Sequence, residues 1–278
     1  MLDSDIDRNG IFLYATDRNN EKQQIYFNDN KRGRRVNYIK VIITKDYDEL
    51  SEKAAKVIIE IIKSNPYAVL GLATGTTPLG LYQKLIADHK KNGTSYKHIR
   101  AVNLDEYKGL PRDHKQSYAY FMRKNLFEHM DIDLENAYIE NGMAENEAAE
   151  CERYDNLLKS MRQDIQLLGL GSNGHIAFNE PNTPFDSTTH VVNLTESTIK
   201  DNSRLFESIL EVPKQAYTMG LKTIMQAKKI LILANGANKA EAVYKTVKSE
   251  ITEAVPASIL QTHPDCTMIV DNEAAKLL

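Results

Sequence analysis

AVLGLATGTTPLG, at residues 68–80, leads from an unbroken apolar run through a loop of small and hydroxyl-bearing residues into a proline-led segment. The apolar run lacks the alternation of a strand with one solvated face, so it predicts a strand covered on both faces of a sheet. Pro78 suits the first turn of a helix, where a missing N–H costs nothing. We therefore expect a strand at 68–73, a loop, and a helix over 78–90.

The same order of strand, loop and helix recurs outward from this unit in both directions. Further strands are expected at 41–43, 101–104, 165–170, 190–192, 230–234 and 268–270, and helices at 46–62, 117–128, 145–161, 221–227 and 238–247. Apolar strands separated by amphipathic helices indicate an α/β protein. We predict an open, mostly parallel, doubly wound (Rossmann-like) sheet with helices on both faces, in which ligands bind beyond the carboxyl ends of the strands.

Residues 1–35 differ in composition from the rest of the chain. They are rich in Asp, Asn, Arg and Gln, show no sustained hydrophobic period, and end in the basic run KRGRR at 31–35. On a chain whose net charge is -3, such a run is more often a solvated tail than a nucleic-acid patch. We expect residues 1–35 to be a polar N-terminal extension, disordered or not native, and residues 36–278 to form a single domain.

Bulk properties exclude several classes of partner and compartment. The net charge of -3 gives no general attraction to nucleic acid or to an anionic membrane. No apolar run approaches the roughly 20 residues that span a bilayer, and residues 1–20 lack the basic start of a signal peptide. Cys151 and Cys266 have no CxxC partners, which favours reduced thiols over a disulfide or a metal site. We expect a cytoplasmic protein with no metal, no nucleic-acid partner and no membrane.

The loop Thr74-Gly75-Thr76-Thr77 stands between a predicted strand and a predicted helix. Backbone N–H groups at a helix N-terminus, beside small residues and hydroxyls, form an anion site without any lysine. The loop lacks the GxxxxGK[ST] form, which argues against a nucleoside triphosphate. The alternative is a tight turn in which threonine caps the helix.

A second motif, Asn103-Leu104-Asp105-Glu106-Tyr107, follows another predicted strand. A carboxylate sheltered from water can act as general base on a carbon acid next to a carbonyl. Asp105 is the candidate for this base. The alternative is that Asp105 caps the next segment and Glu106 is solvated.

A third motif, GLGSNGHIAFNEP at 169–181, matches the dinucleotide pattern GxGxxG. That pattern should open a long helix early in the chain, whereas Pro181 and Pro184 forbid a long helix here. The glycines more plausibly let the backbone approach a small substrate. His175 and Glu180 form a candidate proton-transfer pair, although a lone histidine on such a loop is often structural.

Two basic residues are candidates for completing an anion site. Arg204 lies in NSRL at 202–205, and Lys239 follows the apolar run at 230–234 where a helix is expected to start. Most Arg and Lys side chains are solvated surface groups. Lys239 is the stronger candidate, because the start of a helix after a strand is an expected phosphate position.

Taken together, these motifs resemble the signatures of the glucosamine-6-phosphate deaminase family. The likeness covers LATGTTP at 72–78, NLDEYKGL at 103–110 and GSNGHIAFNEP at 171–181, and it extends from about residue 40 to the C-terminus. The resemblance implies an enzyme that converts glucosamine 6-phosphate into fructose 6-phosphate and ammonia in amino-sugar catabolism. It implies a small amino sugar phosphate as the partner and no cofactor.

The resemblance also implies roles for individual residues. Asp105 would move a proton between C2 and C1 of the open-chain sugar, and His175, positioned by Glu180, would assist opening of the pyranose ring. The 6-phosphate would be held by Thr74, Gly75, Thr76, Thr77, Arg204 and Lys239. Asn173 stands in the catalytic loop where some members carry Asp, and an amide cannot ionise. A charge relay through Asn173 is therefore excluded, so Glu180 must orient His175.

The resemblance also bears on regulation and assembly. Allosteric members carry basic residues after the Glu-Pro pair, whereas residues 190–193 read HVVN, so we expect no activation by N-acetylglucosamine 6-phosphate. Members occur as monomers and as homo-oligomers.

The closest rival function is that of a 6-phosphogluconolactonase, which would not need Asp105. The other is a non-catalytic sugar-phosphate sensor, which would not need Asp105, His175 and Glu180 together.

Overall fold

The computed structural model describes residues 2–7, 10–16, 22–27, 39–203 and 206–278. Its main sheet has the strand order β1-β2-β3-β4-β13-β12-β9-β5-β6-β8, and every pairing from β4 to β8 is parallel. The parallel strands are β4 (Ile39–Thr44), β5 (Val69–Leu72), β6 (Arg100–Asn103), β8 (Ala137–Tyr138), β9 (Ile165–Gly169), β12 (Ile230–Ala234) and β13 (Cys266–Asp271). This is the mostly parallel sheet predicted from the apolar runs.

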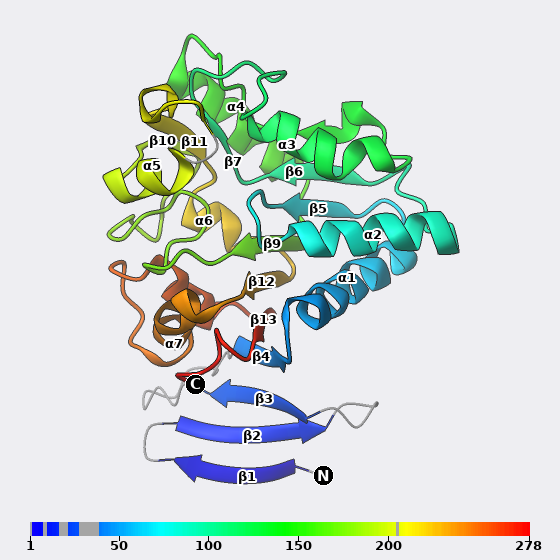
Figure 1. The fold of residues 1–278 in the computed structure, drawn as a ribbon, viewed down its shortest axis with the longest axis vertical. Coiled ribbons are helices and arrows are strands. Elements are labelled where there is room, and N and C mark those ends of the chain that lie inside the picture. The colour runs from blue at the N-terminus through cyan, green and yellow to red at the C-terminus, as the bar shows by residue number, and fades with distance from the viewer. Residues whose placement is uncertain (1, 8–9, 17–21, 28–38, 204–205) are drawn as a thin grey trace.

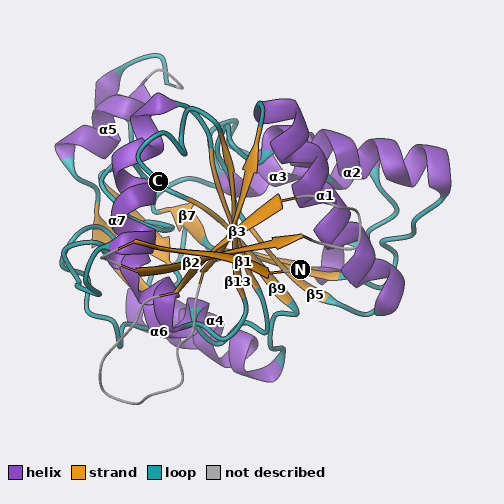
Figure 2. Ribbon diagram, turned by 90° about the horizontal axis from the view of Figure 1, so that it is seen from below, coloured by secondary structure: helices purple, strands orange, loops and turns teal. Residues whose placement is uncertain are grey.

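Helices cover both faces of the sheet, as predicted. They are α1 (Tyr47–Ser64), α2 (Leu79–Asn92), α3 (Tyr118–Asn125), α4 (Glu147–Ser160), α5 (Glu196–Ser203), α6 (Leu221–Ile224) and α7 (Ala240–Lys248). Viewed along the stacked strands, α1 and α2 lie on one side of the sheet and α6 and α7 on the other (Figure 2). In the described residues, no helix is both long and apolar enough to cross a membrane.

Local sequence accounts for the first βα units. The Asp46 carboxylate accepts a hydrogen bond from the Glu49 N–H and so caps α1, as expected of an acid at that position. All four residues of β5 are buried. At Gly71, a Cβ atom would lie 2.1 Å from Oε1 of Gln166. A larger residue at 71 would therefore force the buried Gln166 side chain out of its observed position.

A small second sheet corrects one prediction. The strand expected at 190–192 does not join the parallel series but forms β10 (His190–Asn193) in an antiparallel sheet with β11 (Gln215–Thr218) and β7 (Asp105–Tyr107). Its residues are half-buried or exposed, which suits a strand covered on one face only. The pairing places Thr218 opposite Asp105. This sheet therefore fixes the backbone that carries the candidate base.

Three further strands lie near the N-terminus, where the sequence shows no sustained period. They are β1 (Leu2–Asp7), β2 (Gly10–Thr16) and β3 (Lys22–Phe27), and β3 pairs antiparallel with β4 (Figure 1). The basic run at 31–35 lies outside the described residues. That residues 1–35 stand apart from a single domain at 36–278 stays a prediction.

Candidate active site

The three strand-end motifs meet at one cavity of about 260 Å³. Its wall includes the loop 74–77, Asp105 of β7 and His175 of the glycine-rich loop. The side chains of Asp105 and His175 thus open into the same space, although they are far apart in the sequence. Because the carboxyl ends of parallel strands share one edge of a sheet, this convergence is the one expected.

Asp105 has the environment of a general base. Its side chain is buried, with 7% of its surface exposed, and it forms no hydrogen bond with the described part of the chain. Burial raises the pKa of Asp105 to about 8, and the charge of Glu106 adds to the shift. A poorly solvated carboxylate with a raised pKa is a strong proton acceptor.

Glu106 has a different task from its neighbour. Its carboxylate accepts hydrogen bonds from the backbone N–H groups of Tyr107, Tyr118 and Ala119 at 2.8–2.9 Å. Burial raises the pKa of Glu106 to about 7, against the lowering effect of these three bonds. The alternative of a capping Asp105 and a solvated Glu106 is therefore wrong. Glu106 is the buried group that holds the first turn of α3, and Asp105 is left open to the cavity.

Asn173 connects His175 to Glu180. Asn173 Oδ1 lies 2.7 Å from His175 Nδ1, and Asn173 Nδ2 donates a 2.8 Å hydrogen bond to Glu180 Oε2. A carboxylate accepts only, so the amide must present Nδ2 to Glu180 and its oxygen to the imidazole. Nδ1 of His175 consequently carries a proton, and Nε2 is the nitrogen free for proton transfer. Glu180 Oε2 lies 3.6 Å from Nδ1, too far for a hydrogen bond, so Glu180 orients His175 chiefly through Asn173.

Glu180 is held as a carboxylate. Its burial alone would raise its pKa, but the imidazole of His175 and the hydrogen bonds from Thr198 and Asn173 lower it to about 2. The Thr198 hydroxyl donates to Glu180 Oε1 at 2.8 Å. Both carboxylate oxygens are thus occupied by neighbours, which leaves Glu180 as a fixed negative charge beside His175.

The loop 74–77 presents N–H groups to the opposite part of the cavity. The carbonyls of Thr76 and Thr77 accept from the hydroxyl of Tyr47, and the Thr77 hydroxyl donates to Asn235 Oδ1 at 2.9 Å. The backbone N–H groups of Gly75, Thr76 and Thr77 have no hydrogen-bond acceptor among the described residues. With its carbonyls turned toward Tyr47, the loop can offer these N–H groups to an anion.

Lys239 lies on the same cavity wall. It is the last residue of a 3-10 turn, Ala237–Lys239, that leads directly into α7, and its side chain is half-buried. The structure thus places Lys239 on the cavity wall, and its role as a phosphate ligand stays a prediction. Arg204, the other predicted cation, lies outside the described residues.

The geometry and the sequence can be compared with known proteins. A family described as glucosamine-6-phosphate isomerases/6-phosphogluconolactonase matches residues 45–269. The chain belongs to this family. The glucosamine-6-phosphate deaminase of Geobacillus sp. (strain WCH70) is 51% identical over 241 residues, 86% of this chain and 96% of the relative. That of Thermoanaerobacter pseudethanolicus is 52% identical, over 86% of this chain and 95% of the relative.

Solved structures of the glucosamine-6-phosphate isomerase/6-phosphogluconolactonase family share the fold. A monomeric glucosamine-6-phosphate deaminase superposes with a TM-score of 0.84 at 49% identity, covering 86% of this chain and 99% of its own. The 6-phosphogluconolactonase of Trypanosoma brucei superposes with a TM-score of 0.69 at 24% identity, covering 86% and 98%. The second likeness concerns the fold alone.

In this member of the family, Gly171 lies directly against the imidazole ring of His175. A Cβ atom at Gly171 would lie 2.3–2.5 Å from three ring atoms of His175. We predict that Gly171→Ala displaces the ring and lowers kcat/KM by about 100-fold, since a displacement of about 1 Å can cost that much. Steady-state kinetics check the effect, and a thermal unfolding midpoint close to that of the unmodified protein shows that the fold is kept. Full activity of the variant would show that the His175 position is not needed.

Glu140 is a buried carboxyl group that no motif indicated. Its side chain is fully buried, and neither carboxyl oxygen has a hydrogen-bond partner in the described residues. Burial raises the pKa of Glu140 well above its usual value, and the nearby charges of Asp105, Glu106 and Glu150 add to this. Burial therefore favours the protonated form of Glu140 in the folded protein. Glu140 reinforces the acidic, poorly solvated surroundings of Asp105.

We predict that Glu140→Leu increases the free energy of unfolding by about 1–3 kcal/mol, because it removes an unpaired buried polar group. The pKa of the Glu140 carboxyl group is higher in the folded than in the unfolded protein. The group therefore contributes to stability below its unfolded pKa, and this contribution is lost as pH rises through its folded pKa. The gain should therefore be larger at pH 9 than at pH 5. Urea denaturation at both pH values measures it, with the exposed Glu152→Leu as control. A variant less stable at both pH values would contradict the prediction.

Sequence reasoning missed two residues that complete the cavity. The ring of Tyr118 packs against Tyr107 and Phe178, at centroid distances of 4.8 and 6.0 Å, and it lines the cavity. Thr198 reaches Glu180 from α5. Neither belongs to a motif, and only the tertiary structure brings them in. No group of three or more His, Cys, Asp or Glu in the described ranges could hold a metal ion.

Proposed function

We propose that this protein converts glucosamine 6-phosphate and water into fructose 6-phosphate and ammonia, by isomerisation followed by deamination. The observation that carries the proposal is the shared cavity: a poorly solvated carboxylate, Asp105, and an oriented imidazole, His175, face a loop with unused N–H groups and Lys239. The identity of 49–52% to proteins named glucosamine-6-phosphate deaminase supports it.

In the proposed reaction, His175 acts before Asp105. With Nδ1–H held by Asn173, Nε2 is available to transfer a proton at the ring oxygen of the pyranose, which opens to the aldehyde form. The carboxylate of Asp105 then removes the proton from C2, and the electron pair moves into an enolamine. Delivery of that proton to C1 gives the ketimine at C2. Water adds to C2, and ammonia leaves.

The opposite part of the cavity holds the phosphate in this proposal. The N–H groups of the loop 74–77 supply directional hydrogen bonds, and Lys239 supplies a positive charge. Arg204 is proposed as a further phosphate ligand on the basis of the resemblance. Fixing the phosphate at this end leaves the amino-bearing carbon at the Asp105 end, which is the orientation that the chemistry needs.

The enzyme is proposed to act in the cytoplasm, where amino-sugar phosphates are consumed, and as a monomer. The 49% identical protein of known structure is described as monomeric, which supports this assembly. Sedimentation at the mass of one chain agrees with the proposal, and a multiple of that mass contradicts it. Recovery of the native protein in a membrane or secreted fraction would contradict the cytoplasmic assignment.

An ammonia-release assay tests the proposed function directly. Purified protein is mixed with glucosamine 6-phosphate, and both ammonia and fructose 6-phosphate are measured. We expect equal amounts of the two products. A parallel assay follows hydrolysis of 6-phosphogluconolactone. Lactone hydrolysis without ammonia release would replace the deaminase proposal with the lactonase one, and activity on neither substrate would favour a sensor.

A further inference from the structure

A second cavity of about 210 Å³ lies behind the wall that carries the catalytic groups. Asn103 lines this cavity, whereas Leu104 and Asp105 line the catalytic one. In α3, Ala119 lines the second cavity and Tyr118 the catalytic one. No residue lines both. The strand end and the first turn of α3 therefore separate two distinct spaces.

Asn103 lines the second cavity and has an unused hydrogen-bond donor. Its side chain is 2% exposed, and Nδ2 has no partner among the described residues. The backbone carbonyl of the same residue is fixed by the hydroxyl of Tyr154 at 2.6 Å, so the position is rigid. A buried amide N–H₂ group without an acceptor is costly, and a ligand acceptor would relieve the cost.

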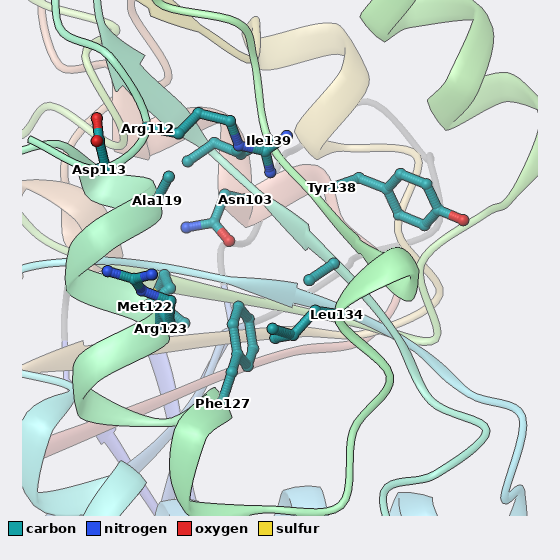
Figure 3. A pocket seen from close by; sticks show the side chains of 11 residues that line it. Asn103, Arg112, Asp113, Ala119, Met122, Arg123, Phe127, Leu134, Tyr138 and Ile139 are labelled. Carbon is teal, nitrogen blue, oxygen red and sulfur yellow. The ribbon is translucent and has the colours of Figure 1, made fainter.

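Arg112 supplies a positive charge at the same place. Its guanidinium forms no hydrogen bond or ion pair with the other described residues, although its charge lowers the pKa of Glu106. The side chains of Arg112 and Asn103 both line this cavity (Figure 3). Asp113 is the acidic residue in the lining, and its carboxylate points away from Asn103 in the same view. Arg112 and Asn103 are both donors, so together they select an anion.

The rest of the lining is mostly apolar. The exceptions are Tyr138 and Arg123, whose Nε lies 3.5 Å from Glu128 Oε1 in an ion pair. Met122, Phe127 and Ile139 are buried, and with Leu134 they enclose the space next to the two donors. A ligand must therefore carry a compact apolar body. Because Arg123 is paired with Glu128, Arg112 is the cation that remains for a ligand. Arg112 matches one negative charge, whereas a phosphate dianion would keep an uncompensated charge next to apolar side chains.

We propose that this cavity binds a small organic monocarboxylate, with its carboxylate on Arg112 and Asn103 and its apolar body between α3 and the segment 134–139. The planar guanidinium fork matches the geometry of a carboxylate. The cavity is smaller than those that hold drug-sized ligands, which limits the body to about the size of one aromatic ring. The site is distinct from the sugar-phosphate site, since the two cavities share no lining residue.

Benzoate is the probe for the test, because it has one carboxylate and one ring. The full chain is produced with methyl-labelled methionine, and the Met122 methyl resonance, identified with Met122→Leu, is followed by NMR during titration. We expect a saturable shift with benzoate up to about 10 mM, given the affinity that so small a ligand can reach. Benzamide and inorganic phosphate should bind at least about tenfold more weakly. Fructose 6-phosphate should not displace benzoate.

Matched variants separate the donors from general charge effects. Arg112→Gln and Asn103→Leu should each weaken benzoate binding by about tenfold or more, since each removes a donor to the carboxylate. Lys115→Gln removes a positive charge from the same loop at an exposed position and should leave binding unchanged. The other methionine resonances report whether each variant is folded. No Met122 shift, equal binding in Arg112→Gln, or displacement by fructose 6-phosphate would overturn the proposal.

Discussion

Replacing Asp105 with Asn is expected to lower kcat by about 10²–10⁴-fold, the range that a general base supplies. The amide has nearly the same shape as the carboxylate but cannot accept a proton at C2. The side chain of Asp105 forms no hydrogen bond with the described residues, so little local structure depends on its charge. Binding of the sugar phosphate should therefore persist, and KM should change less than kcat. Ammonia release under saturating substrate measures the effect.

The pH profile gives a second readout for the same residue. Burial raises the pKa of Asp105 to about 8, and the base must be ionised to act. The kcat/KM of the unmodified enzyme should therefore fall as pH decreases below about 8. The ammonium group of a bound amino sugar favours the carboxylate, so the corresponding limb of kcat should lie at lower pH. Asp105→Asn should abolish this limb in any residual activity.

Asp105→Asn should also stabilise the protein above neutral pH. A carboxyl group with a raised pKa favours the folded state below its unfolded pKa, and that contribution is lost as pH rises through 8. Asn cannot ionise. The free energy of unfolding of the variant should therefore exceed that of the unmodified protein by more than about 1 kcal/mol at pH 9, and by less at pH 5. Asp186→Asn changes an exposed carboxylate and should alter neither activity nor stability. A variant of Asp105 with full activity would remove its assignment as the base.

The parallel part of the fold could be predicted because its apolar runs are compatible with few secondary structures. Runs such as 230–234, whose five residues are all buried in β12, fit only a strand covered on both faces. The antiparallel strands β7 and β11 could not be found in this way, because β7 has only three residues and β11 only four. Their pairing depends on contacts between segments about 110 residues apart in the chain.

The site could be predicted as a set of residues but not as a network. The position of Asp105 after a strand indicated its place in the cavity, whereas the burial of Glu106 depends on N–H groups that α3 brings to it. A sequence pattern cannot show that Asn173 would lie between an imidazole and a carboxylate. Thr198 donates its hydrogen bond to Glu180 from a position 18 residues further along the chain, and no local sequence signal indicates this contact.

His175→Gln is the second substitution for which we expect a large loss, about 10²–10⁴-fold in kcat/KM. Gln can still accept a hydrogen bond, but it cannot exchange a proton with the ring oxygen. His98→Gln replaces an exposed histidine that stacks on Tyr67 and serves as the matched control, with no expected change. Equal activity of the two variants would show that ring opening does not depend on His175.

The contact between Asn173 and His175 decides whether the imidazole acts alone or as part of a fixed unit. Asn173→Leu removes the acceptor of the Nδ1 proton and one donor to Glu180, so the ring can rotate and its tautomer is no longer fixed. We expect a smaller loss than in His175→Gln, because the imidazole is still present. Asn173→Asp restores an acceptor for Nδ1 but places a second carboxylate beside Glu180, and like charges raise the pKa of the pair. Its activity should therefore approach that of the unmodified enzyme only at high pH, where both carboxylates are ionised. Equal pH profiles for Asn173→Asp and the unmodified enzyme would mean that Glu180 does not sense this neighbour.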